Sequence, residues 1–166
     1  MTVPARTFLG LPVEGDINEG DKREKQRPLE DLQPILQALL DDEGVIEFGW
    51  KQYTPYFNDG EPCTFRAYGA WVRTAADADV DDRYELEIDY SHRSIGKRPK
   101  TWNSAARDYD YGAYEGPDEA RFDRCHTLDR AIDGGEFLDV LVDAFGDHAE
   151  VTVRRDGFQV EFYSHD

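Results

Sequence analysis

The stretch Val151-Thr-Val-Arg-Arg-Asp-Gly-Phe-Gln-Val-Glu-Phe162 shows the pattern that decides the fold. Apolar side chains alternate with polar ones on both sides of the central Asp-Gly pair. Asp-Gly is among the strongest signals for a tight turn between antiparallel strands. The stretch therefore predicts a β-hairpin with one apolar face and one polar face.

Three more alternating segments lie upstream, over residues 46–51, 65–72 and 84–90. The third is the most regular, because Tyr84, Leu86, Ile88 and Tyr90 alternate with acidic residues. In the second, Ala67 and Trp71 fall on one face. Alternation of this kind is typical of half-buried strands, so the segments predict an antiparallel meander with one solvated face.

Two regions carry helical spacing instead. Leucines recur with helical periodicity after Pro28 and stop before Gly44, which predicts a helix over 29–43. A second helical region surrounds Leu128 and Ile132, and after Gly134-Gly135 it resumes over 136–146.

The order α-β-β-β-loop-α-β-β predicts an α+β fold with an antiparallel sheet of about five strands and two helices. We expect one domain over residues 28–166, preceded by an irregular N-terminal segment over 1–27, which is rich in glycine and mixed charge. The expected core is Leu36, Trp50, Trp71, Leu86, Ile88, Leu141, Phe145, Val160 and Phe162.

Composition supports a folded chain with a charged exterior. The 166 residues include three Trp, nine Tyr and nine Phe, which is too aromatic for a disordered acidic segment. Two cysteines are too few for a disulfide framework. There is no apolar run of membrane-spanning length and no leader-like apolar start, so we expect a cytoplasmic protein with free thiols and no membrane partner.

The formal net charge of −17 disfavours direct binding to nucleic acid and favours a basic protein surface as partner. A second interpretation is that the acidity is a background property of a GC-rich genome or a salty cytoplasm. The preference for Asp over Glu and for Arg over Lys fits either background.

One segment, residues 92–107, contains five basic residues and no acid. Its loop 92–102 has two interpretations. It could bind a phosphate-bearing ligand, with an aromatic ring stacking on a base, or it could neutralise the chain's own acids. We favour neutralisation. The candidate phosphate-binding residues are Arg93, Lys97, Arg98, Lys100 and Trp102.

Two acidic features are candidate interaction surfaces. Tyrosines interleaved with acids over 108–119 are typical of exposed recognition surfaces. Acidic residues spaced four apart on the second helix destabilise it slightly, which a basic partner would offset. The candidate residues are Asp108, Tyr109, Asp110, Tyr111, Tyr114, Asp139, Asp143 and Asp147.

No catalytic, metal or cofactor site is predicted. Residues 77–82 resemble the start of a calcium loop, but Asp82 stands where that loop needs glycine and Ile88 where it needs glutamate. Cys125 and His126 are adjacent, and adjacent side chains point apart, so a structural cysteine is the favoured interpretation.

The segment Trp50-Lys-Gln-Tyr-Thr-Pro-Tyr-Phe-Asn-Asp-Gly-Glu-Pro-Cys-Thr-Phe65 resembles a segment of small uncharacterised proteins of bacteria and their phages. This resemblance implies a bacterial or phage origin and no particular activity.

The leading hypothesis is a small acidic interaction protein, carried by a phage or prophage, that binds a basic protein surface and occludes a nucleic-acid site. The alternatives are a nucleotide-binding domain or enzyme that uses the 92–102 loop, and a structural component that self-associates.

Overall fold

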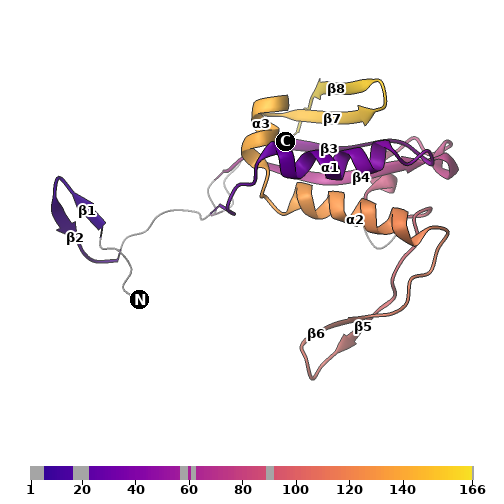
Figure 1. The fold of residues 1–166 in the computed structure, drawn as a ribbon, viewed down its shortest axis with the longest axis horizontal. Coiled ribbons are helices and arrows are strands. Elements are labelled where there is room, and N and C mark those ends of the chain that lie inside the picture. The colour runs from indigo at the N-terminus through magenta and orange to yellow at the C-terminus, as the bar shows by residue number, and fades with distance from the viewer. Residues whose placement is uncertain (1–5, 17–22, 57–59, 61–62, 89–91, 166) are drawn as a thin grey trace.

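A computed structural model describes residues 6–16, 23–56, 60, 63–88 and 92–165. Its centre is a four-stranded antiparallel sheet in the order β4-β3-β7-β8 (Figure 1). The strands are β3 (Val45–Tyr53), β4 (Arg66–Thr74), β7 (Ala149–Arg154) and β8 (Gly157–Phe162). The predicted hairpin is confirmed as β7 and β8, and the mixed α and β class with antiparallel sheets is confirmed with it.

Three helices pack on one face of this sheet: α1 (Leu29–Leu40), α2 (Glu119–Asp133) and α3 (Leu138–Phe145). In α1 the buried residues are Leu32, Leu36 and Leu39, which share one helical face against Phe48 and other core residues of the sheet. The first helix thus ends before the predicted boundary at residue 43. Within the described residues, no helix is both long and apolar enough to cross a lipid bilayer.

The other face of the sheet is partly covered by residues 75–88, which form two short 3₁₀ turns, η1 (Ala75–Asp77) and η2 (Arg83–Leu86). Here Trp71, Val80 and Leu86 form a second, smaller apolar cluster. The predicted strand over 84–90 is therefore wrong in its first half, because Asp82 accepts the Tyr84 N–H and starts a turn. Its last residues, 89 and 90, lie outside the described residues.

A bulge near Gly69 corrects the predicted faces of the second strand. The register of β3 and β4 shifts between Gly49 and Lys51, and Gly69 has a φ of +63°. The extra residue moves Ala67 to the helical face, while Trp71 faces the opposite cluster. Simple alternation had placed the two on one face.

Most of the predicted core is buried, but Val160 and Phe162 of β8 are exposed. Their alternation with polar residues is real, yet no described helix covers this end of the sheet. Phe145 of α3 meets Trp50 in the core, with 5.8 Å between the ring centroids, and reaches β8 at Phe158, with 5.4 Å between the ring centroids. The prediction for Val160 and Phe162 was wrong because periodicity identifies a face and not what covers it.

The N-terminal segment that was predicted to be irregular contains a short hairpin, β1 (Arg6–Phe8) with β2 (Leu11–Val13), which lies apart from the sheet in Figure 1. Nearer the body the chain is held by hydrogen bonds. The Arg27 N–H donates to the Glu136 carbonyl at 2.7 Å, and the Gln26 side chain donates to the Gly135 carbonyl at 2.8 Å.

Candidate interaction surface

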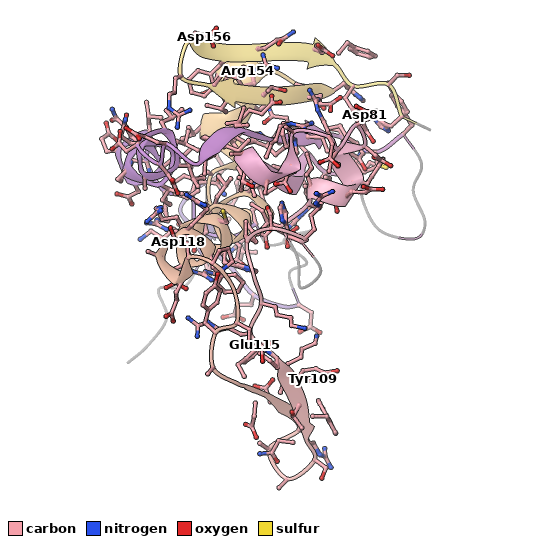
Figure 2. All side chains as sticks on the ribbon, turned by 90° about the vertical axis from the view of Figure 1, so that its right-hand side faces the viewer. Asp81, Tyr109, Glu115, Asp118, Arg154 and Asp156 are labelled. Atoms are coloured by element: carbon pink, nitrogen blue, oxygen red, sulfur yellow. The ribbon has the colours of Figure 1, made fainter. Side chains whose placement is uncertain are left out.

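The long connection between the sheet and α2 forms a projecting hairpin of β5 (Lys100–Asn103) and β6 (Asp108–Tyr111). We call residues 97–115 the arm, since Lys97 also pairs with Glu115 at its base. Figure 1 shows the arm leaving the body on the side away from β8, and Figure 2 places Tyr109 on the arm, beyond Glu115. The arm presents two faces to solvent.

One face of the arm is aromatic. Trp102 pairs with Tyr109 and Lys100 with Tyr111, so these four side chains share one side of the ribbon. The Trp102 and Tyr109 rings meet edge to face at 5.1 Å, and Lys100 Nζ lies 4.4 Å from the Tyr109 centroid. Trp102, Tyr109 and Tyr111 remain 54%, 41% and 54% exposed. Trp102 and Tyr109 thus order each other, and the three rings leave a broad aromatic surface in solvent.

The opposite face is polar and acidic, with Thr101, Asn103, Asp108 and Asp110. Asn103 Nδ2 donates to Asp110 Oδ2 at 3.1 Å, across the strands. Asn103 Oδ1 also accepts the Ala105 N–H at 3.1 Å, which orders the tip. The alternation of tyrosine and aspartate in the sequence therefore becomes a separation of the two kinds of side chain.

Tyr114 anchors the base of the arm rather than lying on its surface. Its hydroxyl donates to the Ile95 carbonyl at 2.7 Å and accepts the Asp118 N–H at 3.1 Å. A Cβ at Gly96 or Gly116 would lie 2.5 or 2.4 Å from that hydroxyl, so both glycines are required for the fit. The prediction that Tyr114 is an exposed contact residue is corrected: it is half-buried and positions the arm.

The basic loop neutralises nearby acids. Arg93 lies 3.4 Å from Asp77 and 3.3 Å from Asp79, and Lys97 lies 4.0 Å from Glu115. Arg93 and Lys97 therefore pair with acids at two separate places. They give a phosphate no common centre to bind.

Of the remaining two cations, Arg98 also pairs with acids, and Lys100 contacts an aromatic ring. Arg98 lies 2.6 Å from Glu119 and 3.5 Å from Asp123 on α2, and the Glu119 hydrogen bond raises the pKa of Arg98. Lys100 is stacked on Tyr109. The four predicted phosphate ligands therefore point to different partners, and Trp102 belongs to the aromatic face of the arm.

The acidic row predicted for the second helix is interrupted. Asp139 lies in the first turn of α3 and forms an ion pair with Arg23 at 2.8 Å. Asp143 is exposed on the same helix. Asp147 lies beyond the end of the helix at Gly146 and accepts hydrogen bonds from the Thr54 N–H and hydroxyl at 2.8 and 2.6 Å. Asp147 is therefore a structural residue and does not continue a helical row.

The two other motifs singled out in the sequence also have structural roles. Thr74 is the N-cap of η1 and Asp77 accepts the Thr74 N–H to complete a capping box, while Asp82 is the N-cap of η2. Burial raises the pKa of the Cys125 thiol to about 12, which makes it a poor nucleophile. Among the described residues, no group of three or more His, Cys, Asp or Glu side chains could hold a metal ion.

A small cavity of about 140 Å³ on the second face of the sheet was not predicted. Lys51 Nζ lies 4.5 Å from the Tyr84 ring centroid, and the Arg83 guanidinium lies 4.9 Å from that of Trp71 while pairing with Glu150. The cations that line this cavity thus already cover the aromatic rings of the cavity. No sequence signal links these residues, since they come together only through the bulge and the η2 turn.

A cluster of tyrosines and histidines at the end of the sheet was also missed. Tyr56 stacks on His148 and His165 at centroid distances of 4.9 and 4.5 Å. His148 Nδ1 lies 2.8 Å from His165 Nε2, so one ring donates to the other. The cluster fastens the C-terminal residues to the sheet. Phe57, Asn58 and Asp59, which follow Tyr56 in the sequence, lie outside the described residues.

No protein-family model, curated protein or solved structure matches this chain.

Proposed function

We propose that this chain is an acidic interaction protein whose arm binds a basic protein surface and thereby occludes a nucleic-acid site on that partner. The observation that carries the proposal is the two-faced arm, with Trp102, Tyr109 and Tyr111 exposed on one side and Asp108 and Asp110 on the other. An exposed aromatic surface of this kind supplies contact area at low entropic cost.

The exposed area of the three rings is too small to form a stable interface alone. Three rings of about 150–250 Å² each, about half exposed, supply roughly 300 Å². A stable interface needs about 800 Å² from each partner. The surface next to the arm must supply the rest. Figure 2 places Glu115 at the base of the arm and Asp118 at the start of α2, where each lies beside a cation, Lys97 and Arg121.

Charge favours a basic partner. The arm itself carries four basic and three acidic residues, so the steering of a cationic surface toward it comes from the acidic body of the chain. The net charge of −17 acts in the same direction at long range. An acidic surface that covers a cationic one competes with nucleic acid for it, because both use the same charges.

The test is affinity capture from bacterial lysate with three immobilised proteins. They are the wild type, an arm variant (Trp102→Ser, Tyr111→Ser) and a control (Phe8→Ser, Leu11→Ser) that removes comparably exposed apolar residues from β1–β2. We expect basic proteins on the wild type and the control, and at least about tenfold less on the arm variant. Capture should weaken when salt rises from about 0.1 to about 0.5 M.

A purified captured partner then tests occlusion directly. Fluorescence anisotropy of a labelled DNA duplex bound to that partner should fall when the wild-type chain is added, and not when the arm variant is added. Capture that is independent of the arm, or a captured partner that is acidic, would refute the proposal.

A further inference from the structure

Among the strands that the structure describes, β8 is an open edge of the sheet, and all six of its residues are exposed. The opposite edge, β4, is covered: the Ile88 N–H donates to the Ala70 carbonyl at 2.8 Å, and the His92 ring contacts the Val72 carbonyl at 2.9 Å. Open edges offer unpaired backbone groups to any passing strand, and folded proteins normally protect them.

The free backbone groups of β8 belong to its apolar residues. The Tyr163 N–H donates inward to the His148 carbonyl at 2.8 Å. Backbone groups alternate along an antiparallel strand, so those of Phe158, Val160 and Phe162 point outward, away from β7. The side chains of these three residues are also 51%, 47% and 74% exposed, in a row beside the buried core face of β7.

We propose that two copies of this chain pair through β8, antiparallel about a two-fold axis at Val160, to form one continuous sheet. This register pairs Phe158 with Phe162 of the second copy and places Gln159 opposite Glu161 of the second copy. All outward N–H and C=O groups of the three apolar residues are then hydrogen-bonded.

Other registers fit less well. A shift of one residue places the apolar row of one copy beside the polar row of the other. A centre at Glu161 places two carboxylates face to face, which is destabilising. A centre at Val160 instead places an amide, which can donate, beside a carboxylate, which can accept. In the single chain Gln159 Nε2 already donates to Glu161 Oε1 at 3.1 Å.

Self-association and binding by the arm use distant surfaces. In Figures 1 and 2 the hairpin β7–β8 and the arm leave the body at opposite ends. Each copy carries a charge of −17, so pairing of two copies should strengthen with salt, whereas binding of a basic partner should weaken. An experiment can therefore refute self-association through β8 without refuting partner binding by the arm, and the reverse.

The first experiment is sedimentation equilibrium of the full chain from about 1 µM to about 0.5 mM, at about 0.1 and about 1 M NaCl. We expect the molar mass to double from 19.0 kDa with concentration, at lower concentration in high salt. Val160→Pro removes an outward N–H without touching the pairs with β7 and should abolish the doubling. Val160→Thr keeps that N–H and should dimerise within about threefold of wild type.

The second experiment fixes the register in folded protein, in a Cys63→Ser background. Residues paired at the axis have Cα atoms about 5.5 Å apart, within disulfide range, so Val160→Cys should cross-link two copies on mild oxidation. Gln159→Cys is the matched control, because its counterpart in the second copy would lie about 8 Å away.

A wild-type chain that stays monomeric at all concentrations in both salts would overturn the proposal. Equal cross-linking of both cysteine variants would also overturn it. Removal of residues 1–16 tests whether the β1–β2 hairpin of a second copy, rather than its β8, makes the dimer contact. If the truncated chain no longer dimerises while the Val160→Pro variant still does, the contact belongs to that hairpin and pairing through β8 is refuted.

Discussion

Gln52 offers the sharpest test of how the sheet and α3 are joined. Its side chain is fully buried and makes three hydrogen bonds. Oε1 accepts the Trp50 indole N–H at 2.9 Å, while Nε2 donates to the Leu141 and Gly146 carbonyls at 2.9 and 2.7 Å. Gln52→Leu keeps the approximate size of the side chain and leaves one buried donor and two carbonyls without this partner.

Each orphaned group costs about 1–3 kcal/mol, and the added apolar burial returns about 1–2 kcal/mol, so we expect a net loss of about 3 kcal/mol. A domain of this size is stable by about 8–15 kcal/mol, so the variant should still fold. The assay is urea denaturation followed by tryptophan fluorescence and circular dichroism. The control is Gln33→Leu on the exposed side of α1, which should change the free energy of unfolding by less than about 0.5 kcal/mol. A loss below about 1 kcal/mol for Gln52→Leu would refute the bridging role.

Three other outcomes concern ion pairs and the basic loop. Asp42 is nearly buried, and hydrogen bonds from Arg121 and Arg124 hold its pKa well below its usual value of 3.8. Asp42→Asn should therefore cost about 3 kcal/mol at pH 7. The difference from wild type should be complete above pH 3.8 and shrink as pH falls further, since protonation in the unfolded chain then opposes folding; urea titrations across this range measure it. Gly44→Ala should lower the melting temperature by several degrees, about 1–3 kcal/mol, because a Cβ there would lie 2.0 Å from the Arg121 guanidinium and displace it. In a thermal-shift screen with common nucleotides we expect no shift for wild type, because Arg98 is paired with Glu119; a reproducible shift that Arg98→Gln abolishes would make a phosphate-bearing ligand the better hypothesis.

Alternation in the sequence predicted the sheet well where a turn signal confirmed it and poorly where none did. The Asp-Gly signal between β7 and β8 predicted both strands, and the observed register pairs Arg154 with Gly157 across Arg155 and Asp156. Residues 84–90 have an even cleaner alternation, yet Leu86 and Ile88 reach two different apolar clusters through a 3₁₀ turn. A period of two residues does not distinguish these outcomes, because both bury every second side chain.

The candidate site was predicted in part, and the limits are physical. Tyr109 and Tyr111 do lie on an exposed surface, since a short hairpin with one aromatic face has no core of its own to bury it. Tyr114, only three residues further, reaches the body because Gly96 and Gly116 leave space for its ring. That space depends on glycines from two segments, and local sequence does not show that they meet.

Salt makes the two proposed contacts respond in opposite ways. At an ionic strength of 0.15 M charges are screened beyond about 8 Å, so much of the repulsion between two copies is removed while contacts at the strand edge persist. Attraction between the arm and a cationic surface acts partly at longer range and is reduced by the same screening. A paired molecule would extend two arms from opposite ends of one sheet, and two linked arms bind a partner with two sites more tightly than one arm does. Val160→Pro should therefore weaken capture of such a partner without altering the intrinsic affinity of a single arm, which a titration of monomeric variant against purified partner would measure.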